Sequence, residues 1–75
     1  MKLLCETKFP ARGCNAAGAV VLRDKREGQH MRYVTHWRND ETGGHCHGHY
    51  FDNFLEARTD YRRRVAAEIK MHKAD

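Results

Sequence analysis

The segment from residue 31 to residue 51 constrains the fold more than any other part of the chain, because it combines turn residues with residues that favour strands. Two runs rich in β-branched, aromatic and histidine side chains flank Asp40-Glu41-Thr42-Gly43. This pattern predicts a β-hairpin whose type I turn is followed by a glycine in the left-handed region. If Asp40 pairs with Gly44, then Trp37 faces His47 on the opposite strand.

The predicted register divides the side chains of the hairpin between two sheet faces, since alternate residues of a strand point in opposite directions. One face carries Met31, Tyr33, Thr35, Trp37, His45, His47, His49 and Phe51. The other face carries Arg32, Val34, His36, Arg38, Cys46, Gly48 and Tyr50. The first face is the more apolar, so we expect a helix to cover it. The other face is the alternative, since Gly48 would admit a helix closely, but it also carries Arg32 and Arg38.

Two further strands are predicted before the hairpin. Over residues 2–9 the side chains follow a period of two, which predicts a strand, and Pro10 ends this pattern. Residues 18–24 contain a compact β-branched run, and the charged residues that follow, up to Gly28, predict a hairpin turn. Successive strands joined by such links form an antiparallel meander.

One helix is predicted after the hairpin, over about residues 53–72, and Asn53 can cap its N-terminus. Side chains that recur at intervals of three and four give it one inward face: Phe54, Ala57, Tyr61, Val65, Ile69 and His72. The expected fold is therefore α+β in a single small domain, residues 1–75. It has a three- or four-stranded antiparallel meander (about 2–9, 18–24, 31–38 and 45–51) with the helix packed on one face.

Length and composition indicate the number of domains, the cellular compartment and the charge of a binding partner. Seventy-five residues allow one domain with a thin core. Three cysteines at unrelated spacings favour reduced thiols in the cytoplasm, and no apolar run approaches the length of a membrane span. The net charge of +4 favours an anionic partner.

The leading hypothesis is a small basic binding module for nucleic acid. Arginines that alternate on a sheet face beside an aromatic ring can contact phosphates and stack a base. A basic helix would add phosphate contacts, although consecutive arginines on a helix point about 100° apart and do not form one patch. The candidate residues are Arg23, Arg32, Arg38, Tyr50, Arg58 and Arg62.

A metal-binding domain is a further alternative. His45, His47 and His49 would project from one strand face in a row, and adjacent imidazoles of such a row can share a zinc ion. Cys14 could supply another ligand. The paired-cysteine spacing of structural zinc sites is absent, so the alternative role is that of ordinary strand histidines.

A regulator or inhibitor that binds another protein is the second hypothesis, with a homodimer formed through an open edge strand or the remaining sheet face. In size and architecture the chain is similar to many small accessory proteins of phages, plasmids and bacteria, among them nucleic-acid binders and docking inhibitors. We expect no enzymatic activity, because no nucleophile and base carry a flanking signature and so small a core does not readily enclose a pocket.

Overall fold

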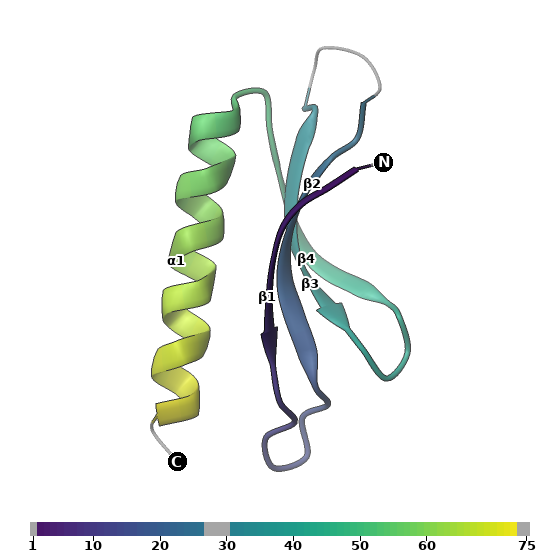
Figure 1. Ribbon diagram of the computed structural model, residues 1–75, viewed down its shortest axis with the longest axis vertical. Helices are drawn as coiled ribbons and strands as arrows, with labels where there is room; N and C mark the ends of the chain where they lie inside the picture. Colours follow the sequence, from purple (N-terminus) through teal and green to yellow (C-terminus); the bar gives the residue numbers. More distant parts are fainter. Residues whose placement is uncertain (1, 27–30, 74–75) are drawn as a thin grey trace.

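A four-stranded antiparallel sheet and one helix form the described part of the chain, residues 2–26 and 31–73, in this computed structural model (Figure 1). The elements are β1 (Lys2–Phe9), β2 (Gly18–Asp24), β3 (Tyr33–Asn39), β4 (His45–Phe51) and α1 (Phe54–Lys73). The strands lie in the sheet in the order β1-β2-β3-β4. The predicted α+β meander with a C-terminal helix is confirmed, and it has four strands.

The predicted limits of the elements agree closely with those observed. The third strand begins at Tyr33 and not at residue 31, because the positive φ of Met31 (52°) turns the chain just before it. Asn53 caps α1 as predicted, since its side-chain oxygen accepts hydrogen bonds from the backbone N–H groups of Leu55 (2.7 Å) and Glu56 (3.3 Å). Glu27 and Gly28 of the predicted turn lie outside the described residues.

Helix α1 covers the sheet face that carries Tyr33, Thr35 and Trp37, as predicted (Figure 1). Phe9 lies against both Trp37 and His72, with ring centroids 6.3 Å and 5.2 Å apart, and thereby joins β1 to the last turns of α1. Phe54 packs edge-on against Tyr33 at the other end of the helix, 5.6 Å between centroids.

The inward face of α1 departs from the prediction at Ile69, which is exposed, whereas Ala57 is fully buried. Polar side chains take up much of the contact between α1 and the sheet. Asp60 accepts a hydrogen bond from the buried hydroxyl of Thr35 and lies 3.1 Å from the Nε of Arg64, one helical turn further along α1. Burial alone would raise the pKa of Asp60, but hydrogen bonds from Thr35, His49 and Arg64 outweigh burial and lower it.

The predicted register of the β3–β4 hairpin is correct at Thr35, which pairs with His49, but wrong by one residue nearer the turn. Trp37 pairs with Cys46 and not with His47. Asn39 closes the turn with Gly44 (N···O 2.8 Å), so the shift is absorbed by a β-bulge at His47, whose φ is 56°. Because side chains alternate, this shift exchanges the faces of His45 and Cys46 relative to the prediction.

Candidate functional site

The sheet face opposite α1, here called the open face, carries a groove of about 300 Å³ near the outer strand β4. Its lining residues are Arg23, Lys25, Val34, His36, His45, Cys46, Gly48 and Tyr50. They come from β2, the residue after it, β3 and β4, so the groove exists only once these strands have paired. Among the residues that the structure describes, none that lines the groove is acidic.

The hollow depends on Gly48, which lies between the bulge and Tyr50 on β4. A Cβ atom at Gly48 would lie 3.5 Å from the ring of Tyr50. The ring therefore borders the space that a larger side chain at position 48 would fill. Tyr50 remains 54% exposed, whereas Val34, its partner on β3, is buried. The groove therefore has an apolar floor and an accessible aromatic wall.

The groove is electropositive. The ammonium group of Lys25 lies 5.1 Å from the centre of the Tyr50 ring, in a cation–π contact, and Arg23 lines the same hollow. Burial lowers the pKa of His45, and the charges of Arg23 and Arg38 lower it further. Positive charges that disfavour protonation of an imidazole favour an anion at the same place.

His36 forms a buried polar group in the groove. Its side chain is packed edge to face against His45, with centroids 4.1 Å apart, and the residue is only 5% exposed. Burial lowers the pKa of His36 to about 4, with further lowering by His45 and nearby arginines, so the ring is neutral at pH 7. Its Nε2 has no hydrogen-bond partner among the described residues.

Arg32 and Arg38, two of the predicted phosphate contacts, are engaged in ion pairs within the protein. The guanidinium group of Arg32 donates two hydrogen bonds, of 2.7 Å and 2.8 Å, to the carboxylate of Asp24. These bonds lower the pKa of that carboxyl to about 2.

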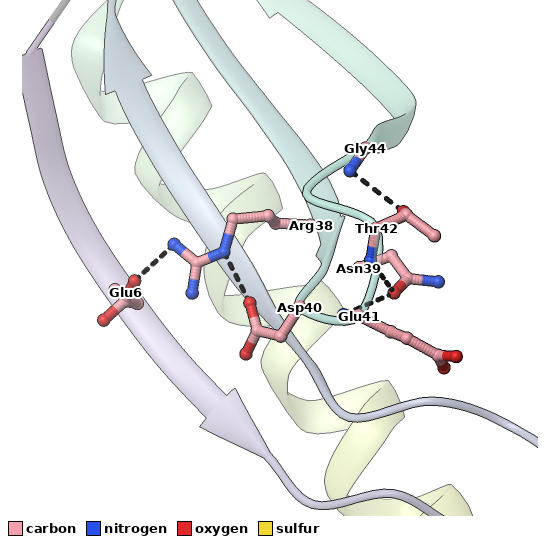
Figure 2. A network of polar contacts seen from close by, with 7 residues as sticks. All are labelled: Glu6, Arg38, Asn39, Asp40, Glu41, Thr42 and Gly44. Carbon is pink, nitrogen blue, oxygen red and sulfur yellow. Dashed lines mark hydrogen bonds and ion pairs between the residues drawn. The ribbon is translucent and has the colours of Figure 1, made fainter.

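Figure 2 shows Arg38 lying across the sheet between Asp40 (2.7 Å) and Glu6 of β1 (2.6 Å), with α1 behind the strands. The side chain thus passes over β2, where Ala19 and Val21 are fully buried although α1 lies on the other face. Of the three arginines predicted on the sheet, Arg23 is the one that lines the groove with Tyr50.

Arg58 and Arg62 are exposed on α1, which packs on the opposite face of the sheet from the groove. They make no ion pair with the residues described here, and they do not line the groove. The structure therefore separates the predicted nucleic-acid residues into two surfaces, one on the sheet and one on the helix.

The three histidines predicted to form a row on β4 are not aligned. His45 packs on His36 in the open face, whereas Nδ1 of His49 lies 3.1 Å from Asp60 of α1 on the covered face. His47 occupies the bulge between them, and its carbonyl accepts a hydrogen bond from Arg64. The predicted row of three histidines on one face is therefore wrong, and among residues 2–26 and 31–73 no three histidine, cysteine or acidic side chains are placed to share a metal ion.

A second hollow, of about 420 Å³, lies between the C-terminal half of α1 and the sheet, beside Trp37 and Met71. Two charged groups in its wall already have partners: Arg64 is paired with Asp60, and Glu68 lies 3.8 Å from His72. The groove on the open face is the better candidate site, because it combines an accessible ring, basic side chains in its lining and a buried nitrogen that has no partner in the described part of the chain.

Sequence reasoning did not assign Gly48 to the candidate site, and it gave His45 a different role, that of a metal ligand. Gly48 was the available signal, since a glycine inside a strand often marks a bulge or a close approach. The contribution of His45 depends on the bulge and could not be read from alternation alone.

No family model matches the chain, and no curated protein or solved structure is detectably similar to it. The described residues contain no helix that is both long enough and apolar enough to span a bilayer.

Proposed function

We propose that this protein is a binding module for single-stranded nucleic acid that uses the groove on its open face. The observation that carries the proposal is the exposed ring of Tyr50 beside Arg23 and Lys25, in a groove whose described lining contains no acidic side chain. Aromatic rings stack unpaired bases of any sequence, and flanking cations hold the phosphates. The net charge of +4 adds long-range attraction for a polyanion.

A single strand fits this surface better than a duplex. Bases in a duplex are already stacked on each other, so Tyr50 could reach them only after unpairing. Reading the major groove takes an inserted helix or a two-stranded ribbon, and α1 lies on the far side of the sheet from the candidate groove. The three free cysteines favour a reducing compartment, and we place the activity in the cytoplasm.

Binding to another protein is the second candidate function, because β1 and β4 are both edge strands. An edge strand can pair with a strand of a second chain, including a copy of this one. Irregularities near Leu4 in β1 and at His47 in β4 interrupt the two edges, which disfavours a long continuous pairing. A defined dimer in light scattering, independent of nucleic acid, would favour this candidate.

The test is fluorescence anisotropy with labelled single-stranded DNA, RNA and duplex DNA at two salt concentrations. We expect the protein to prefer single strands, with affinity that falls steeply as salt rises. Replacing Arg23 and Lys25 by glutamine should weaken binding at least tenfold, the equivalent of about 1.4 kcal/mol.

The matched control replaces Arg58 and Arg62 by glutamine, which removes the same charge from the outer surface of α1. This control loses two positive charges away from the groove, so its affinity should stay within about threefold of the affinity of the wild type. A larger loss of affinity in the helix variant than in the Arg23 and Lys25 variant would indicate that nucleic acid binds to α1 and not to the groove. No binding to any strand at low salt would overturn the proposal.

A further inference from the structure

We propose that the groove on the open face is a pocket for one unpaired nucleobase, and that Nε2 of His36 is the hydrogen-bond partner of the base edge. The inference rests on the proposed function and deepens it. It separates two contributions to binding: the cations Arg23 and Lys25 hold the backbone, whereas His36, Gly48 and Tyr50 hold one base.

The first support is the unsatisfied nitrogen of His36. A buried polar atom without a partner is costly, and in folded proteins such atoms usually have a partner, an ordered water or a functional role. His36 is 5% exposed, its Nε2 has no partner among the described residues, and the residue lines the groove. The atom has almost no accessible surface, so a ligand edge in the groove would satisfy this nitrogen once the ring of His45, which packs on His36, turns aside.

The second support is the shape of the groove. Its volume of about 300 Å³ lies at the lower end of the range for ligand pockets, so it suits one small ring system and not a large ligand. The ring of Tyr50 forms one wall, the ring of His45 packs against His36, and Val34 contributes an apolar surface. Flat rings and apolar surface suit a planar heterocycle.

The third support is the charge state of the polar partner. A phosphate or carboxylate is held best by a charged donor, yet the low pKa of His36 leaves its ring neutral at pH 7. A neutral imidazole offers one donor and one acceptor, which match the neutral polar edge of a base. The charged residues at the groove, Arg23 and Lys25, supply the positive charge that the phosphates on either side require.

Gly48 allows the pocket to be filled without disturbing the fold. Its φ lies outside the left-handed region, and an added Cβ would meet only the Tyr50 ring at an ordinary contact distance of 3.5 Å. Gly48→Val therefore places a β-branched side chain, which strands favour, in the space of the proposed base. Ala66→Val adds a similar bulk on the exposed side of α1 and serves as the control.

The experiment compares the binding of two labelled strands by fluorescence anisotropy: a thymidine oligonucleotide of about twelve nucleotides, and an abasic strand of equal length that keeps the phosphates. The wild-type protein and Ala66→Val should bind the thymidine strand on the order of tenfold more tightly than the abasic strand. Gly48→Val should bind both strands with the affinity that the wild type has for the abasic strand. His36→Leu should lower the ratio of affinities several-fold while it leaves binding of the abasic strand unchanged.

The outcomes separate the two proposals. Equal binding of both strands by the wild type, or an unchanged ratio in folded Gly48→Val and His36→Leu, would overturn the base pocket and leave phosphate binding in place. Absence of binding to either strand would overturn both proposals. If circular dichroism finds Gly48→Val unfolded, Gly48→Ala together with His36→Leu decides the result by the same ratio.

Discussion

The imidazole rings of His36 and His45 lie edge to face on the open side of the sheet, 4.1 Å between centroids and at 86° to each other. His36 is buried at this contact, and His45 comes from the edge strand β4. Both rings have a lowered pKa, chiefly because burial disfavours their charged form. The pair therefore links the candidate site to the acid stability of the fold.

The stability of the protein should fall as the pH drops from about 6.5 to about 4. In this window the unfolded chain binds a proton at His36, whereas the folded protein, with a His36 pKa of about 4, does not. The folded state should lose on the order of 3 kcal/mol relative to neutral pH. Urea unfolding of the wild type and His36→Leu across this range measures the difference.

His36→Leu should reduce the pH dependence between pH 6.5 and pH 4 and leave the part that His45 contributes. A second loss should remain in both proteins below pH 4, because the pKa of Asp24 is about 2 in the folded state and its ionised form is stabilised by Arg32. An equal slope in both proteins above pH 4 would contradict the role assigned to His36.

Asp60→Ala should destabilise the protein by about 2 kcal/mol, since the buried Thr35 hydroxyl would lose its acceptor. A loss of this size would lower the melting temperature by roughly 10 °C in a domain of this length. Glu41→Ala, in the exposed turn of the hairpin, is the control and should change the melting temperature little. Similar values for the two variants would show that α1 is not anchored through Asp60.

Gly18→Ala should be the more damaging of two glycine substitutions in strands. A Cβ at Gly18 would lie 2.3 Å from the Trp37 ring and 2.4 Å from the backbone oxygen of Arg38, so the sheet itself would have to move. We expect a loss of roughly 1–3 kcal/mol or more. Gly48→Ala, whose Cβ meets only Tyr50 at 3.5 Å, should stay within about 0.5 kcal/mol of the wild type in the same urea titration.

Releasing Arg38 from its ion pairs should strengthen nucleic-acid binding. Glu6→Gln combined with Asp40→Asn removes both partners of this arginine and leaves its charge available to phosphate. Affinity for single strands should rise several-fold at low salt, with a steeper salt dependence.

The control for that variant is Glu41→Gln combined with Glu56→Gln, which changes the net charge equally at two exposed positions. An equal rise in affinity in both variants would mean that net charge alone, and not Arg38, governs the effect.

The sequence alone was sufficient for the secondary structure, and it favoured, without deciding, the face that the helix covers. Strand limits followed from alternation and from Pro10, and the start of α1 followed from Asn53, because these signals act over a few neighbouring residues. The aromatic side chains of β3 also marked the covered face correctly. Such features depend on local chemistry and on a two-residue period that can be read directly.

The tertiary structure decided which side chains share the candidate site. One bulged residue, His47, brought His45 to the open face and separated it from His49, since a shift of one residue reverses the direction of every side chain beyond it. Arg32 pairs with Asp24 of β2, and Arg38 pairs with Glu6 of β1, two strands away in the sheet; only the folded sheet brings these partners within reach. The groove itself requires three strands in register, and no local pattern in the sequence encodes that arrangement.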